Sequence, residues 1–172
     1  QACPQASLWM GGRTYAAGAD GAIALPFSTR PGSTPVLLVD GDVATVAAIA
    51  LRGESYGFAA SWLLDRQSLI PGTEAQALVR IDLTIGGTPA SLAVLEEPYV
   101  EIATTDRRGV TAKQRLPLAV AADRDAEVAF AVPAHAASVA LAVGARVRVL
   151  SEQRTLELRD DRTISVGAMH AG

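Results

Sequence analysis

Alternation of apolar and polar residues is the clearest pattern in the chain. From Glu74 to Ile85, alanine, valine, isoleucine or leucine occupies every second position, and polar residues occupy nearly all the positions between. Only Leu78 interrupts the polar series. This pattern predicts a strand that buries one face and exposes the other. Shorter runs with the same alternation follow at residues 99–105, 110–120, 128–132, 139–149, 156–158 and 164–166.

Turn-forming residues separate these runs. Gly86-Gly87 follows the first run, and Asp106-Arg107-Arg108-Gly109 places a glycine where a hairpin turn needs positive φ. Strands that recur at intervals of roughly 8–12 residues are typical of an antiparallel sandwich or barrel. The region from Glu74 to Val166 lacks the strand–helix alternation of a parallel sheet. The sequence therefore predicts an all-β fold built from antiparallel sheets.

The first part of the chain is less regular but is also rich in candidate strands. These candidates are residues 7–10, 13–15, 22–27, 36–39 and 43–51. A weak repeat relates this part to the second at an offset of about 90 residues, close to the size of one immunoglobulin-like sandwich. Chance similarity between Ala- and Val-rich strands explains it equally well. We expect a small or partial β-rich domain over residues 1–55, a β-sandwich over 56–167 and a tail over 168–172.

Composition narrows the possible functions. Of the 172 residues, 49% are hydrophobic and 19% are charged, and the net charge is −3. The chain can therefore bury a core, and its negative charge argues against nucleic-acid binding. One cysteine and two histidines leave little material for a zinc site or for histidine-based catalysis. No run reaches the roughly 18 apolar residues of a membrane span. We expect no cofactor, no nucleic-acid partner and no membrane span.

The beginning of the chain leaves two questions open. The sequence starts at Gln1 and not at methionine, so we expect a processed protein or a piece of a longer one. Cys3 follows Gln-Ala and is compatible with the lipid-bearing residue of a lipobox. We favour an incidental thiol, because the upstream residues that would define a lipobox are not part of the sequence.

One motif suggests an enzyme. Gly53-Glu54-Ser55-Tyr56-Gly57 matches the G-x-S-x-G pattern of the nucleophile elbow in α/β-hydrolases. A small serine esterase would use Ser55 as nucleophile, Asp123 as acid and His135 or His170 as base. However, an elbow is followed by a helix, whereas the residues after Ser55 also alternate like a strand. We favour a non-catalytic chain and keep the esterase as an alternative.

An acidic segment and the aromatic residues suggest binding sites. Asp123, Asp125 and Glu127 alternate before a predicted strand and could supply oxygen ligands to calcium, although a solvated turn is the preferred interpretation. A carbohydrate-binding module is a further alternative, because exposed aromatic rings can stack on sugars. The candidate rings are those of Trp9, Trp62 and Tyr99, of which Trp62 is better explained as a core residue.

Four basic residues could form a strip on one strand face. Arg146 and Arg148 lie at outward positions of one run, and Lys113 and Arg115 lie at outward positions of another. The simpler interpretation is that these charges protect a strand face or edge from aggregation.

Four segments resemble a macroglobulin-like module, a β-sandwich domain found in alpha-2-macroglobulin-type secreted or envelope proteins. The segments are LDRQSLIPG at 64–72, ALVR at 77–80, GTPASL at 87–92 and TDRRGV at 105–110. The resemblance extends over about residues 56–166. It implies a spacer or protein-interaction module that contacts protein partners or neighbouring modules of the same chain, in an extracellular or cell-envelope location. The family's Cys-Gly-Glu-Gln thioester motif is absent, so no covalent trapping is implied.

Overall fold

The computed structural model describes residue 3 and residues 5–166, and these residues form an all-β chain. The chain divides into two compact units. The first unit comprises residues 1–54 and 150–152, and the second comprises residues 55–149 and 153–172. The tail expected at 168–172 lies outside the described residues.

A single open sheet forms the first unit. It contains β1 (Ser7–Met10), β2 (Arg13–Ala16), β3 (Gly32–Asp40) and β4 (Val43–Leu51), in the antiparallel order β2-β1-β3-β4. The strand expected at 22–27 is wrong, because this segment pairs with no other strand. Pro26 lies within it and lacks the N–H that a sheet ladder requires. Among the described apolar residues of this unit, only Leu8 and Val36 are buried.

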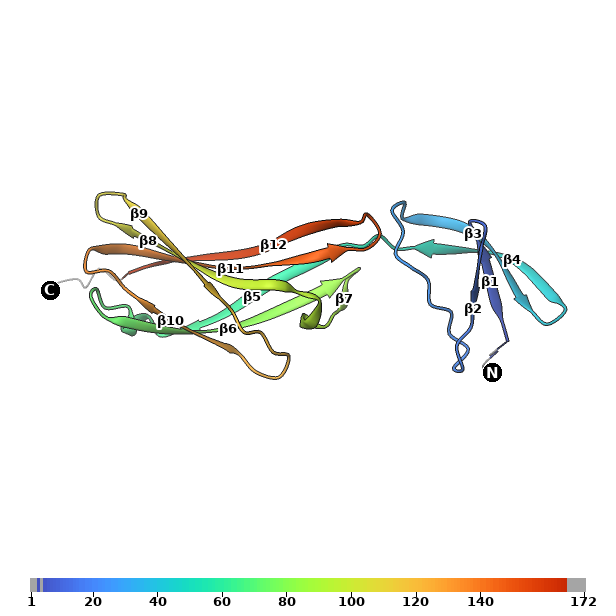
Figure 1. The fold of residues 1–172 in the computed structure, drawn as a ribbon, viewed down its shortest axis with the longest axis horizontal. Helices are drawn as coiled ribbons and strands as arrows, with labels where there is room; N and C mark the ends of the chain where they lie inside the picture. Colours follow the sequence, from blue (N-terminus) through green and yellow to red (C-terminus); the bar gives the residue numbers. More distant parts are fainter. Residues whose placement is uncertain (1–2, 4, 167–172) are drawn as a thin grey trace. The chain divides into compact units, whose positions relative to one another are not determined.

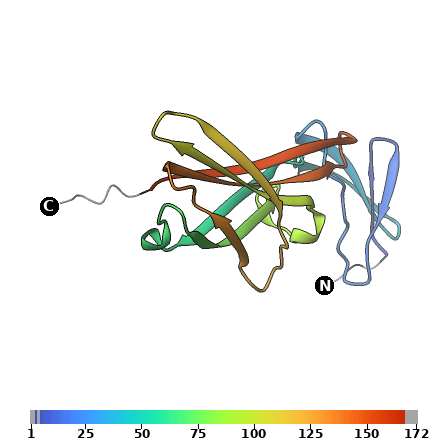
Figure 2. The ribbon, with the colours of Figure 1, turned by 60° about the vertical axis from the view of Figure 1, so that its left-hand side comes forward.

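Two facing antiparallel sheets form the second unit (Figures 1 and 2). One sheet has the order β10-β6-β5, with β7 beside β6, and the other has the order β12-β11-β8-β9. Two short 3-10 turns, η1 (Arg66–Ser68) and η2 (Leu92–Val94), lie in the loops. The strands are β5 (Tyr56–Leu64), β6 (Glu74–Ile85), β7 (Thr88–Pro89), β8 (Glu96–Asp106), β9 (Thr111–Pro117), β10 (Ala126–Ala131), β11 (Ala136–Val149) and β12 (Arg154–Ser165).

The core of this sandwich follows directly from the alternation in the sequence. Strand β6 spans the residues that the alternation predicted, and its alternate apolar side chains from Ala75 to Leu83 are buried. Strand β11 contributes Val139, Leu141 and Val143, which are fully buried. Side chains of both sheets interdigitate there, and such burial is the main favourable contribution to folding. The all-β antiparallel sandwich is therefore confirmed.

A hydrogen bond joins the edges of the two sheets. The Oδ2 atom of Asp160 on β12 accepts a hydrogen bond of 2.7 Å from the backbone N–H of Ala60 on β5. Strand β5 is an edge strand, so this N–H has no partner in its own sheet. A side chain of one sheet thus satisfies a backbone donor of the other, which protects the edge from pairing with another chain.

Candidate functional site

The outer face of the sheet β12-β11-β8-β9 carries the densest group of polar side chains in the described chain. Strand register places Tyr99 between Pro117 and Gly144, and it places Glu101 between Arg115 and Ala142. The middle strand, β11, presents small residues outward at 140, 142 and 144, so long side chains from its neighbours can lie across it. We call the following residues the Tyr99 face: Tyr99, Glu101, Lys113, Arg115, Glu157 and Arg159.

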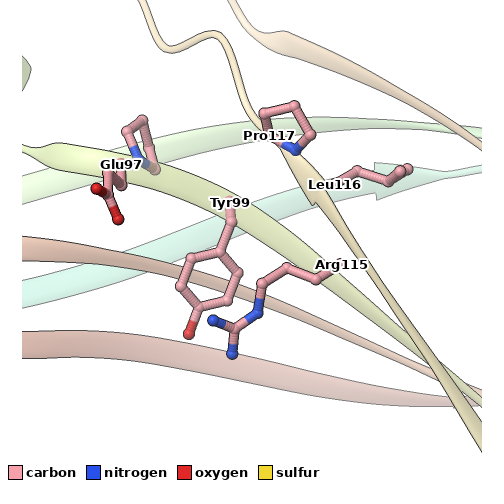
Figure 3. A pocket seen from close by; sticks show the side chains of 6 residues that line it. Glu97, Tyr99, Arg115, Leu116 and Pro117 are labelled. Carbon is pink, nitrogen blue, oxygen red and sulfur yellow. The ribbon is translucent and has the colours of Figure 1, made fainter.

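Tyr99 is the aromatic centre of this face. Its ring lies over Gly144, where an added Cβ atom would overlap the ring's Cζ atom and hydroxyl oxygen. The hydroxyl donates a hydrogen bond of 2.7 Å to Oε1 of Glu157. The guanidinium carbon of Arg115 lies 3.8 Å from the ring centroid, in a cation–π contact (Figure 3). Burial, followed by the hydrogen bond to Glu157, raises the pKa of Tyr99 above its ordinary value.

Glu101 is the anionic centre of the face. Its carboxylate accepts a hydrogen bond of 2.9 Å from Arg159, and Lys113 and Arg115 lie 3.4 and 3.5 Å from its oxygens. Only 12% of the Glu101 side chain is exposed. The hydrogen bond from Arg159 is the main cause that lowers the pKa of Glu101, and the same bond raises the pKa of Arg159. The carboxylate is therefore ionised at neutral pH and lies among three cations.

A hollow of about 470 Å³ lies at one end of the Tyr99 face (Figure 3). It is lined by Glu97, Pro98, Tyr99, Arg115, Leu116 and Pro117. Glu97 has a left-handed backbone with φ of 48°, beside an irregularity in the pairing of β8 with β11, and its carboxylate pairs with Arg146. None of the lining residues is a serine, cysteine or histidine. The lining is suited to recognising another surface and offers no activated nucleophile.

The residues of the esterase alternative do not come together in one site. Ser55 directly precedes β5, and its carbonyl accepts a hydrogen bond from the N–H of Gly86, just beyond the end of β6. His135 follows β10, whose last residue pairs with Glu74 at the other end of β6. Eleven residue steps along β6 span about 37 Å, and the four steps from β10 to His135 recover at most about 14 Å.

The third proposed member of the triad is also remote, and the elbow itself does not form. Asp123 lies in the loop before β10, whose first residue pairs with Val79 in the middle of β6. A strand, β5, follows Ser55 where the hydrolase motif needs a helix. His170 lies outside the described residues.

The structure does not gather the candidate calcium ligands Asp123, Asp125 and Glu127 into a metal-binding group. Asp125 forms an ion pair with Arg80, with 2.7 Å between Oδ1 and Nε. Among the described residues, no three His, Cys, Asp or Glu side chains gather in a way that could hold a metal ion. The acidic residues of this loop therefore include one that already has a cationic partner.

The aromatic residues proposed for sugar stacking have different surroundings. Trp9 is 51% exposed on β1. Trp62 packs against the sandwich core, and its indole N–H is buried without a hydrogen-bond partner in the described chain. Tyr99 is only 7% exposed and is covered by Arg115, so its ring face is already occupied.

Three of the four cations in the candidate basic strip have a carboxylate beside them. Lys113 and Arg115 lie beside Glu101, and Arg146 pairs with Glu97. The sequence indicated the cations but not their carboxylate partners, because strands far apart in the chain contribute them. The small outward residues of β11 were the one signal in the sequence that a large side chain crosses this strand.

The remaining observations concern the first unit and membrane association. The thiol of Cys3 is exposed, and a hydrogen bond with Asp40 raises its pKa.

Over the described range, no helix is long and apolar enough to cross a membrane.

Comparison with curated proteins finds one relative named for actin binding. The chain is 27% identical over 161 residues to actin-binding protein F of Dictyostelium discoideum. The alignment covers 89% of this chain but only 7% of that protein, so the chain spans a small part of its relative's length. No solved structure matches the chain. The expected extracellular or cell-envelope location is wrong, because the similarity is to a protein named for actin binding and not to a secreted protein.

A family model matches most of the second unit. The model described as the AbpF third immunoglobulin-like domain matches residues 65–171, which is more than half of the chain. The match covers every strand from β6 to β12. It supports the immunoglobulin-like part of the expected resemblance and does not support the macroglobulin part. The chain therefore belongs to the AbpF third immunoglobulin-like domain family.

Proposed function

We propose that the chain is a non-catalytic protein-interaction module that contributes to the binding of actin within a longer protein. The observation that carries this proposal is the alignment with actin-binding protein F over 89% of the chain. The fold supports it, since immunoglobulin-like sandwiches commonly act as recognition modules on rigid scaffolds. Residues 56–167 would form the interaction module, and residues 1–55 would form a separate β-rich unit. Because actin filaments are intracellular polymers, the module would act inside the cell.

The Tyr99 face is the surface that best suits such a contact. Its arginines already contact Glu101 and Tyr99, so part of their side-chain freedom is restricted before a partner binds. Tyrosine and arginine are enriched at the energetic centres of protein interfaces. Arg115 belongs to both groups of contacts, because it lies over the Tyr99 ring and beside Glu101.

Sedimentation with actin filaments tests this proposal. The chain is expected to pellet with filaments in a saturable way, and Arg115→Glu is expected to weaken binding about tenfold or more. The matched control is Arg107→Glu, which makes the same charge change in the exposed β8–β9 turn and should bind normally. Circular dichroism checks that both variants keep the strand signal.

Two results would contradict the proposal at different levels. A chain that stays in the supernatant at every filament concentration would exclude an actin-binding role. Equal weakening by Arg115→Glu and Arg107→Glu would leave actin binding standing but would exclude the Tyr99 face as the specific contact.

A further inference from the structure

The leucine that interrupts the polar series of β6 has an apolar neighbour on the sheet surface. In the antiparallel register, Leu78 on β6 lies opposite Leu63 on β5 and opposite Glu127 on β10. Ala77 and Val79, on either side of Leu78, point into the core, so Leu78 faces outward. Leu63 is 68% exposed. The two leucines therefore form an apolar patch on the outer face of this sheet.

This patch forms part of a hollow of about 620 Å³, which we call the Leu63–Leu78 hollow. Its lining residues are Leu63, Asp65, Gln76, Ala77, Leu78, Glu127, Val128 and Ala129. The side chains of Ala77 and Val128 are buried in the core, so the accessible floor consists of Leu63, Leu78 and Ala129. The volume lies within the range of about 300–1,000 Å³ typical of binding sites.

The rim of the hollow is acidic. Asp65 and Glu127 line it, and the described chain gives Glu127 no ion-pair partner. Strands β5, β6 and β10 contain three carboxylates and a single cation, Arg80, which is paired with Asp125. Beside the hollow, β5 presents only glycine, alanine and serine outward at residues 57, 59 and 61, so no bulky side chain limits access.

We propose that the Leu63–Leu78 hollow is a docking site for a polypeptide segment of a partner protein that carries one large apolar side chain flanked by lysine or arginine. The apolar side chain would cover Leu63 and Leu78, and contiguous exposed apolar surface of this kind marks interaction sites. The flanking cations would meet Glu127 and Asp65. The same carboxylates repel nucleic acids and anionic lipids. This site lies on the opposite sheet from the Tyr99 face and does not depend on actin binding.

Nuclear magnetic resonance titration with a defined peptide tests this site. The probe is a ten-residue peptide with a central leucine, two lysines on each side of it and serine elsewhere. We expect amide shifts to concentrate at residues 63–65, 76–78 and 127–129 of the isotope-labelled full chain. Leu78→Gln, which restores the polar alternation of β6, is expected to weaken peptide binding about tenfold. Val110→Gln is the matched control, because Val110 is 64% exposed in the turn between β8 and β9, away from this sheet.

The proposal also fixes what related peptides must do. A peptide with glutamate in place of lysine, or serine in place of the central leucine, should bind at least about tenfold more weakly. The proposal is overturned if all three peptides bind alike, if the shifts lie elsewhere, or if Leu78→Gln and Val110→Gln have equal effects. It is also overturned if the lysine peptide fails to bind and the chain instead self-associates through these residues. Thermal unfolding of each variant confirms that the sandwich is intact.

Discussion

Replacement of Gly144 by alanine tests whether the Tyr99 ring determines the residue beneath it. An alanine Cβ would overlap Cζ and the hydroxyl oxygen of Tyr99 and would lie 2.7 Å from Cε1. The ring is nearly buried, its hydroxyl is bonded to Glu157, and Arg115 covers its face, so any movement of the ring away from the new methyl group disturbs these contacts. We therefore expect the ring to shift and lose its hydrogen bond.

Two destabilising contributions and one stabilising contribution set the size of this effect. Overpacking of a buried site costs about 1–3 kcal/mol, and loss of the tyrosine–carboxylate hydrogen bond lies in the same range. Alanine restricts the unfolded chain more than glycine does, which returns about 0.4–1 kcal/mol. Gly144→Ala should thus lower the free energy of unfolding by about 2 kcal/mol. In a Tyr99→Ala background, where the obstacle is gone, the same change should instead stabilise the sandwich by about 0.5 kcal/mol.

Urea denaturation followed by tryptophan fluorescence measures this reversal of sign. In a Trp9→Phe background, Trp62 is the remaining tryptophan and reports on the sandwich unit alone. With a slope of about 2 kcal/mol per molar urea, Gly144→Ala should move the midpoint down by about 1 M. If alanine destabilises both backgrounds by the same amount, the Tyr99 ring does not determine this position and the reasoning fails.

Two further predictions concern charged side chains. Glu101→Gln should cost about 1 kcal/mol at neutral pH, near the low end for charged hydrogen bonds because its three cations are 39–63% exposed. The pKa of Glu101 is lowered in the folded state, so its contribution to stability is complete above the reference pKa of 4.5 and is lost as the pH falls through the folded pKa. The difference in stability between wild type and variant should therefore close in acid. A difference that widens in acid would contradict the assignment. Asp160→Ala should cost about 1–2 kcal/mol, because it leaves the N–H of Ala60 without a partner, whereas Asp161→Ala on the outer face should be nearly neutral in the same thermal melts. Equal effects of the two aspartate variants would show that the contact with Ala60 contributes little.

Alternation predicted the sandwich well because the side-chain period of a strand directly records which face is buried. In β6 the alternate apolar positions from Ala75 to Leu83 line one side of the core. The first unit was harder to predict because its sheet is mostly exposed. Val43 and Val46 on β4 are 66% and 75% exposed, so apolar character there does not report burial.

The functional surfaces were much less predictable, because they depend on which strands become neighbours. Lys113 and Arg115 looked like part of a basic strip, but pairing of β9 with β8 places Glu101 beside them. The G-x-S-x-G pattern around Ser55 does not form an elbow, because a strand follows it. Five residues do not specify whether a strand or a helix comes next. Local sequence determined the faces of the strands, and long-range pairing determined the chemistry on those faces.

The two outer faces of the sandwich differ in how their charges are used. On the Tyr99 face, three cations share one carboxylate, Glu101, so each of them already has an anionic neighbour within the chain itself. A partner there would gain mainly from rigid shape and from arginine and tyrosine contacts. On the opposite sheet, Glu127 has no cationic partner in the described chain, and two leucines lie beside it. A partner that covers the leucines and pairs with Glu127 would gain from both apolar burial and charge complementarity, which is why this face carries the more specific prediction of partner chemistry.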